Sequence, residues 1–172
     1  MPDPARWRWR RAGPADAVLL RDLERAANLV ALAHVFPPAT YPFPDAVVEQ
    51  RWVTALQEPG VVAWVVGRDG PGGAEPLGFV AHDDTWVRQV AVRPEAWGTG
   101  LGSALLDRAV HGVRARGGQP RLWCLRLNER ALGLYGRRGW RRTGTERAAV
   151  HPPHPVEVEL VLVEPVLAGS GA

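Results

Sequence analysis

The stretch of residues 87–106 limits what this chain can fold into more than any other part of the sequence. It starts as a β-branched apolar run, breaks at Pro94, passes Gly98, Gly100 and Gly102, and continues with apolar residues at helical spacing. Glycines let backbone N–H groups approach an anion without a Cβ in the way, and a following helix directs its unpaired N–H groups and positive dipole end to the same point. The order strand, glycine turn, helix therefore predicts a phosphate-binding turn.

The length of the chain predicts one domain. A chain of 172 residues buries roughly 70% of its unfolded surface as a single unit and needs no disulfide or metal to do so. We expect one domain over residues 1–172, with residues 1–5 and 168–172 frayed. No apolar run approaches the roughly 20 residues of a membrane helix, and the basic first residues lack the apolar core of a signal peptide. The expected location is the cytoplasm, without membrane association.

The basic residues exclude several kinds of chemistry. All 21 are arginine, and the formal net charge is only +3, which is a weak reason to expect a nucleic-acid partner. Without lysine, the chain has no phosphate-loop lysine, Schiff-base lysine or serine–lysine dyad, and it contains no Gly-x-Ser-x-Gly. Cys124 lies alone in an apolar run, which favours a buried thiol. His151 and His154 lie among prolines without metal-ligand spacing, so no metal is expected.

Hydrophobic periodicity and the positions of glycine and proline predict an α/β (α+β) domain of order β-α-α-β-β-β-α-β-α-β-β. Its sheet is mixed and mostly antiparallel, and helices flank it. The three middle strands form an antiparallel meander, with a glycine- and proline-rich connection over residues 68–76. The expected strands are residues 7–11, 61–67, 77–81, 86–92, 121–128, 140–144 and 156–163, and the expected helices are residues 14–33, 45–57, 101–116 and 129–138.

Two segments have alternative interpretations. Residues 7–11 alternate aromatic and basic side chains, which suits a first strand; the alternative is an aromatic and basic nucleic-acid patch. Residues 34–44, rich in proline and aromatics, either line an acceptor pocket or simply pack. The glycines themselves fit a dinucleotide-binding turn poorly, because the third glycine comes one position early and no acidic residue follows about twenty residues later.

Two segments together resemble a known family. Residues 90–106, Val-Ala-Val-Arg-Pro-Glu-Ala-Trp-Gly-Thr-Gly-Leu-Gly-Ser-Ala-Leu-Leu, resemble the acetyl-CoA-binding motif of the GCN5-related N-acetyltransferases (GNAT), written Arg/Gln-x-x-Gly-x-Gly/Ala. Residues 125–140, Leu-Arg-Leu-Asn-Glu-Arg-Ala-Leu-Gly-Leu-Tyr-Gly-Arg-Arg-Gly-Trp, resemble the asparagine-to-tyrosine helix of that family. The similarity covers residues 60–145 well, and the whole element order fits a GNAT-like fold.

The resemblance implies a site for acetyl-CoA as cosubstrate. Main-chain groups on the strand before the glycines would pair with the pantetheine arm, and backbone N–H groups of the turn would hold the pyrophosphate. An asparagine would bind near the pantetheine, and a tyrosine would lie beside the sulfur. The implied cofactor-binding residues are Val90, Ala91, Val92, Trp97, Gly98, Thr99, Gly100, Leu101, Gly102, Ser103, Asn128 and Tyr135.

The implied reaction transfers an acetyl group to a primary amine by direct attack in a ternary complex. Such a transfer needs a polarised carbonyl and a proton for the departing thiolate. The backbone N–H of Val90 would polarise the carbonyl, and Tyr135 would act as general acid. The acceptor is a small-molecule or peptide amine, and a homodimer is left open. Aromatic and polar residues that could contact the acceptor are Tyr41, Trp52, His82 and Trp86.

The sequence departs from the family pattern in two ways. Trp97 stands at the position usually taken by arginine or glutamine, so a side-chain contact to phosphate is lost. The strand before the motif carries no carboxylate, although many relatives have a glutamate there. A general base could instead come from one of five side chains, namely His82, Asp83, Asp84, His34 and Glu49.

These departures support a rival from another class, a non-catalytic acyl-CoA-binding or sensing domain. A nucleic-acid-binding protein ranks third, since only residues 7–11 and the arginine content favour it.

Overall fold

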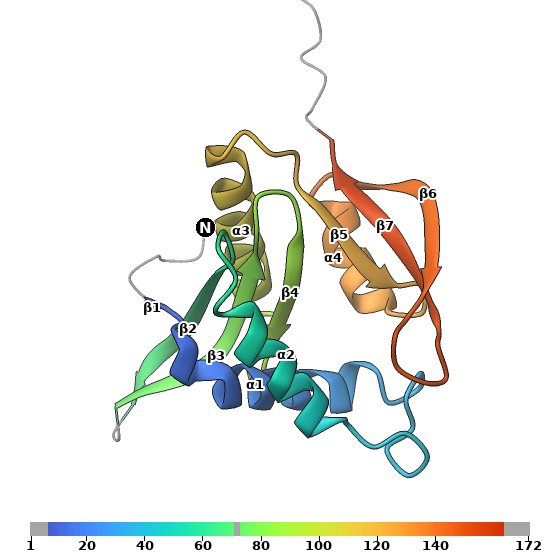
Figure 1. The fold of residues 1–172 in the computed structure, drawn as a ribbon, viewed down its shortest axis with the longest axis horizontal. Helices are drawn as coiled ribbons and strands as arrows, with labels where there is room; N and C mark the ends of the chain where they lie inside the picture. Colours follow the sequence, from blue (N-terminus) through green and yellow to red (C-terminus); the bar gives the residue numbers. More distant parts are fainter. Residues whose placement is uncertain (1–6, 71–72, 164–172) are drawn as a thin grey trace, which may run out of the picture. The chain divides into compact units, whose positions relative to one another are not determined.

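The computed structural model describes residues 7–70 and 73–163, so the expected frayed ends lie outside the described residues. The described chain forms two compact units, residues 1–120 and 121–172, which are taken separately below. The element order is the one expected from the sequence (Figure 1). The expectation of a single acyl-CoA N-acyltransferase domain over residues 1–172 stays a prediction.

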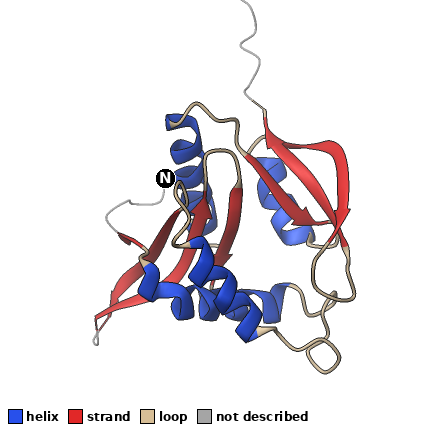
Figure 2. Ribbon diagram, in the orientation of Figure 1, coloured by secondary structure: helices blue, strands red, loops and turns tan. Residues whose placement is uncertain are grey.

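The first unit is a four-stranded antiparallel sheet with helices, in the strand order β1-β2-β3-β4 (Figure 2). The expected meander of the three middle strands is confirmed, because β2 pairs with β3 and β3 with β4, both antiparallel. Short 3-10 helices precede α1 and follow β4. The elements are β1 (Arg8–Arg11), α1 (Ala17–Ala31), α2 (Asp45–Ala55), β2 (Val62–Gly70), β3 (Gly73–His82), β4 (Val87–Val92) and α3 (Leu101–Ala115).

The helices of this unit cover opposite faces of the sheet. One core cluster joins α1 and α2 to alternate strand residues such as Phe79, Ala81 and Ala91. The side chain of His82, on β3, lies on the opposite face of the sheet and contacts α3, because a Cβ on Gly112 of α3 would overlap its ring. Successive strand residues point to opposite faces, so this alternation puts α1 and α2 on one side and α3 on the other.

The strands β2 and β3 extend further than expected. The segment 68–76 was expected to be a connecting loop, but β2 runs to Gly70 and β3 begins at Gly73. Pro76 sits beside a register shift between Val66 and Gly67, and β4 pairs with β3 only from Gly78 onwards. A strand tolerates proline at a register shift where no strand pairs with it on the other side, so the prediction of a loop over residues 68–76 is wrong.

The second unit is a three-stranded antiparallel sheet of order β5-β7-β6 with one helix. Its elements are β5 (Arg121–Leu125), α4 (Glu129–Arg137), β6 (Trp140–Ala148) and β7 (Val156–Leu162). The strand β6 passes the expected end at Gly144 because this glycine, at φ +95°, bends the strand where its register shifts. The strand pairings among the described residues of both units are all antiparallel, and none of the described helices is long and apolar enough to cross a membrane.

Candidate active site

The outer edge of β4 carries unpaired backbone groups. The Arg93 N–H donates to the Leu77 carbonyl, with N and O 2.8 Å apart. Hydrogen-bonded pairs alternate along an antiparallel ladder, so Ala91 bonds to Phe79 and the N–H and C=O of Val90 point away from β3. The strand β4 is the last strand of its sheet among the described residues. Val90 therefore offers a donor and an acceptor to an extended ligand.

Two further observations refine this edge. The Ala91 carbonyl oxygen lies 2.6 Å from the position that a Cβ on Gly78 would take, which agrees with Ala91 facing β3. Opposite the end of β3, Ala81 pairs with Gln89 and His82 with Val87, which leaves Arg88 as an extra residue in a β-bulge. A bulge bends a strand and redirects side chains, so β4 changes direction two residues before Val90.

The glycine turn ends in a helix with available N–H groups. Gly98 and Gly100 have φ of +76° and +88°, a conformation that side chains with a Cβ rarely adopt. A Cβ on Gly98 would meet no atom within 4 Å, so its surroundings are open. No backbone carbonyl among the described residues accepts a hydrogen bond from this turn's N–H groups, namely those of Gly98, Thr99, Gly100, Leu101, Gly102 and Ser103. With the fifteen-residue helix α3 behind them, these donors form an anion cradle.

Trp97 does different work from a phosphate-binding arginine. Its indole Nε1 donates to the Val92 carbonyl at 2.8 Å, which occupies one acceptor on the outer edge of β4. Its backbone N–H donates to the Pro94 carbonyl at 3.1 Å, so this group is already engaged, unlike those of residues 98–103. Trp97 thus ties the glycine turn to the end of β4 and leaves anion binding to the backbone.

Arg93 is the arginine next to this turn with an unused donor. Its Nε is buried without a hydrogen-bond partner among the described residues, while its Nη1 lies 3.5 Å from the Glu95 carboxylate. A buried N–H without an acceptor is costly, so a ligand oxygen reaching it would be stabilising.

In the second unit, Asn128 and Tyr135 belong to α4. The Asn128 Oδ1 accepts from the Ala131 N–H at 3.2 Å and caps the helix, which leaves its amide N–H groups for other acceptors. Tyr135 is 9% exposed, and its ring centroid lies 6.0 Å from that of Trp140. Burial raises the pKa of Tyr135, so its hydroxyl keeps its proton at neutral pH.

The candidate bases around β3 and β4 are all engaged. His82 is 2% exposed, its Nδ1 lies 2.9 Å from the Asp83 carbonyl, and burial lowers its pKa. Burial raises the pKa of Asp83, but hydrogen bonds from Trp86, Thr85 and Arg88 outweigh it and the net pKa is lowered. The exposed Asp84 pairs with Arg116 at 2.6 Å. His82, named above as a candidate base, is covered by α3.

The residues expected to contact an acceptor have mixed positions. Trp52 is 2% exposed, and its ring packs edge-on against Phe79 with the ring centroids 5.2 Å apart. Trp52 therefore belongs to the core. Tyr41 and Trp86 are half-buried, and Trp86 donates its N–H to Asp83 at 2.7 Å. Glu49, a further candidate base, is paired with Arg21.

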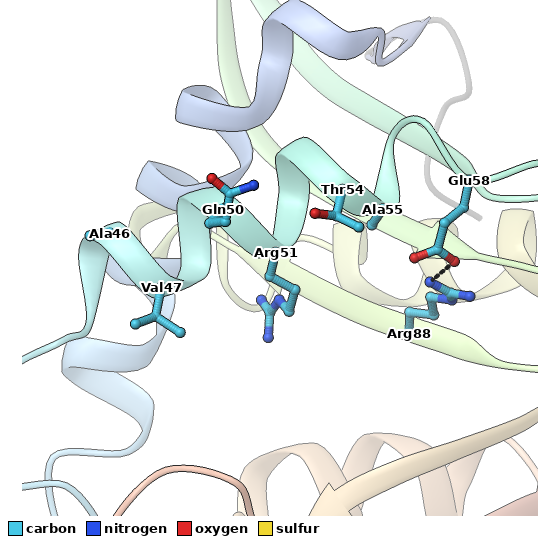
Figure 3. Close-up of a pocket in the computed structure, with 8 residues that line it drawn as sticks. All are labelled: Ala46, Val47, Gln50, Arg51, Thr54, Ala55, Glu58 and Arg88. Atoms are coloured by element: carbon cyan, nitrogen blue, oxygen red, sulfur yellow. Dashed lines mark ion pairs between the residues drawn. The ribbon is translucent and has the colours of Figure 1, made fainter.

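An open groove of about 560 Å³ lies between α2 and β4 (Figure 3). The bulge residue Arg88 contributes to it and pairs with Glu58 at 2.8 Å. Two residues of extended chain span at most about 7 Å, so the Cα of Arg88 lies no further than that from the Cα of Val90. The lining residues are Ala46, Val47, Gln50, Arg51, Thr54, Ala55, Glu58 and Arg88.

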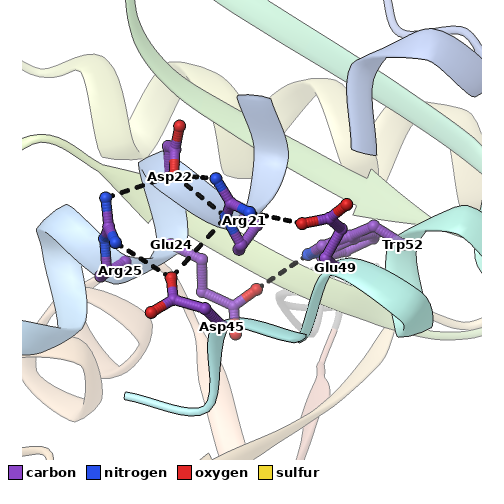
Figure 4. Close-up of polar contacts among 7 residues, drawn as sticks. All are labelled: Arg21, Asp22, Glu24, Arg25, Asp45, Glu49 and Trp52. Carbon is purple, nitrogen blue, oxygen red and sulfur yellow. Dashed lines mark hydrogen bonds and ion pairs between the residues drawn. The ribbon is translucent and has the colours of Figure 1, made fainter. Parts of the chain in front are cut away.

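A buried carboxylate stands behind this groove. Glu24 is 4% exposed and accepts from the indole of Trp52 at 3.0 Å (Figure 4). It also accepts from the guanidinium of Arg51. The sequence reasoning did not single out Glu24 or Arg51. The signal for Glu24 was its position on the apolar stripe of α1, four residues after Leu20.

The unpaired edge of β4 and the N–H groups of residues 98–103 are suited to an extended ligand that carries phosphates. The profile of the Acetyltransferase (GNAT) family matches residues 18–140, more than half of the chain. The chain belongs to this acetyltransferase family, as the motifs in the sequence predicted.

One curated relative is an uncharacterized N-acetyltransferase of Methanocaldococcus jannaschii, 33% identical over 95 residues. That match covers 45% of this chain and 42% of the relative, so the chain spans less than half of the relative's length.

Solved structures share the fold. A GCN5-related N-acetyltransferase from Rhodopseudomonas palustris has a TM-score of 0.73 at 16% identity, with 90% of this chain and 92% of that chain covered. The PaiA N-acetyltransferase from Thermoplasma acidophilum, solved with coenzyme A, has a TM-score of 0.65 at 15% identity, over 89% and 97% of the two chains. Nourseothricin acetyltransferase has a TM-score of 0.64 at 24% identity, over 91% and 97%. These likenesses confirm the expected fold class.

Proposed function

We propose that this protein is an acetyl-CoA-dependent N-acetyltransferase that acetylates a primary amine, carried by a small molecule or a peptide. The observation that carries the proposal is the open edge of β4 running into a glycine turn with unengaged N–H groups. One extended ligand with a pyrophosphate needs both features. Acetyl-CoA is such a ligand.

The described residues fit this cosubstrate. The outward C=O of Val90 is suited to accept a hydrogen bond from an N–H of the pantetheine arm, in the manner of an added strand, which leaves the Val90 N–H for the thioester carbonyl. The N–H groups of residues 98–103, with the positive end of α3, are suited to the pyrophosphate. The carbonyl of Val92 is taken by Trp97, so the proposed pairing relies on Val90, and Ala91 supports it from within the sheet.

Two groups of this chain carry the chemistry in the proposal. Acetyl-CoA, when bound, supplies an acetyl group activated as a thioester. The Val90 N–H polarises the thioester carbonyl and stabilises the negative charge that develops on its oxygen. Tyr135, whose hydroxyl is protonated at neutral pH, gives its proton to the departing sulfur. Asn128 is assigned to the pantetheine by the family motif, and its free amide N–H groups are consistent with that role.

The proton of the attacking amine leaves through water in this proposal. The strand β4 carries no carboxylate, and Asp83 is held ionised by Trp86, Thr85 and Arg88, which makes it a weak base. The amine therefore reacts from its neutral form, and turnover rises with pH as that form accumulates.

The test measures thiol release from acetyl-CoA over a panel of primary amines, for the wild type and for Tyr135→Phe. Removing a general acid lowers kcat by about 10²–10⁴-fold, and calorimetry should show unchanged acetyl-CoA binding. Equal turnover by Tyr135→Phe would remove this tyrosine from the mechanism. Tight acetyl-CoA binding without turnover of any amine would instead favour the acyl-CoA sensor.

A further inference from the structure

Arg51, on α2, holds a guanidinium with one occupied face and one open face. Its edge is bound to Glu24, and its Cζ lies 5.0 Å from the ring centroid of Trp52. The Arg51 side chain is 45% exposed and lines the groove between α2 and β4 (Figure 3). The carboxylate and the indole therefore hold the guanidinium, and the exposed part of the side chain is available to an occupant of the groove.

The same unit contains an arginine that contacts two indole rings. The Cζ of Arg108 lies 4.5 Å from the ring centroid of Trp9 and 4.4 Å from that of Trp64. Among residues 7–70 and 73–163, Arg51 contacts one ring in this way, that of Trp52. An arginine held between planar groups gains cation–π attraction and stacking area on both faces. The site at Arg51 lacks the second planar group.

The charges of the groove disfavour an anionic occupant. Arg51 is neutralised by the buried Glu24, and Arg88 is paired with both Glu58 and Asp83 at 2.8 Å. The remaining lining is small, aliphatic or uncharged, from Ala46, Val47 and other residues of α2. An uncharged planar body suits this lining, whereas a carboxylate or phosphate would have to displace an existing ion pair.

We propose that the acceptor is a primary amine on an aromatic body, and that this body stacks on the open face of Arg51. This inference rests on the proposed acetyltransferase function for the role of the amine. The groove that Arg51 lines is also lined by Arg88, whose Cα is within about 7 Å of that of Val90, so an occupant of the groove lies near β4. Glu24 accepts hydrogen bonds from both Arg51 and Trp52 and so acts as a positioning residue for the guanidinium.

The test compares 2-phenylethylamine with 2-cyclohexylethylamine, which share the chain and the amine and differ in the π system. Wild type should bind the aromatic amine about 3- to 30-fold more tightly by calorimetry, equivalent to about 0.7–2 kcal/mol. The ratio of kcat/KM should favour it similarly. The cyclohexyl ring is the more hydrophobic of the two, so burial alone predicts the opposite order.

Two variants locate the effect. Arg51→Lys keeps the charge beside Glu24 but loses the planar face, and the preference should fall to about 1. Arg108→Lys makes the same change in the flanked site away from the groove, and the preference should not change. Thermal melting of each variant checks that it is folded.

Each outcome decides between the two proposals. Aromatic preference in binding that Arg51→Lys abolishes, without acetylation of either amine, would support the stacking site and refute the aromatic amine as the acceptor, and the panel of primary amines then decides on the acetyltransferase proposal. Acetylation of both amines without preference would refute stacking and leave the acetyltransferase proposal standing. A preference that survives in Arg51→Lys, or disappears in Arg108→Lys, would assign it to another part of the protein.

Discussion

Replacing Val90 by proline removes one backbone N–H without removing a sheet hydrogen bond. The N–H of Val90 points away from β3, because the Arg93–Leu77 hydrogen bond sets the alternation along β4. Proline is accepted on an edge strand when its nitrogen faces outward, and the preceding Gln89 is already extended. Val90→Pro should therefore fold, with a stability loss near the spread of about 1 kcal/mol among strand residues.

The expected effect on catalysis is much larger. Loss of one donor to a developing oxyanion costs about 2.7–4 kcal/mol, or about 10²–10³-fold in kcat. Because the same N–H serves the thioester carbonyl, kcat should fall more than the affinity for acetyl-CoA, which also depends on the N–H groups of residues 98–103.

The assay is thiol release under saturating acetyl-CoA, with binding measured separately by calorimetry. Val90→Ala is the control, since it shortens the side chain but keeps the N–H. Ala91→Pro is the contrast, because it breaks the bond to Phe79 and should cost about 1–3 kcal/mol of stability. A folded Val90→Pro protein with wild-type kcat would refute the catalytic role of the Val90 N–H, and a variant that does not fold would refute its outward orientation.

Three other predictions concern the packing around the site. Gly112→Ala should lower stability by about 1–3 kcal/mol, measured by urea unfolding, because its Cβ would overlap the enclosed ring of His82, whereas Gly136→Ala meets nothing within 4 Å and should raise stability by about 0.5–1 kcal/mol. Cys124 should resist a thiol reagent at pH 8 in the folded protein and react in urea, since burial raises the pKa of its thiol to about 12; fast reaction of the folded chain would contradict this. In a Tyr41→Phe background, the folded protein should show no tyrosinate absorbance near pH 10, because burial raises the pKa of Tyr135. The unfolded chain loses the Tyr135 proton at a lower pH than the folded protein does. The contribution of Tyr135 to folding stability is therefore complete at lower pH and declines as the pH rises above about 10.

Local sequence signals were enough to predict the order of helices and strands and the glycine turn before α3. The apolar spacing of Leu20, Leu23 and Ala27 gave α1, and the glycines after β4 marked the start of α3. Paired motifs identified the family, because residues 90–106 and 125–140 occur in the expected order. These signals succeed because they depend on neighbours within a turn or two of the chain.

Element ends were less predictable. The sequence predicted that Asn128 ends a strand, but the strand β5 ends at Leu125. Asn128 lies beyond it because its side chain caps α4. The long β2 and β3 were hidden by glycine and proline, which favour a loop unless a register shift accommodates them. Strand pairing decides such cases, and it depends on residues far away in the sequence.

The sequence by itself determined the order of elements, the glycine turn between β4 and α3 and the buried Cys124, because periodicity and glycine stereochemistry are local properties. Only the tertiary structure decided that Trp97 binds the Val92 carbonyl, that α3 encloses His82 and that Glu24 orients Arg51. Each of these depends on which strand edge or helix face meets another, and the free energy of those contacts comes from groups brought together by folding.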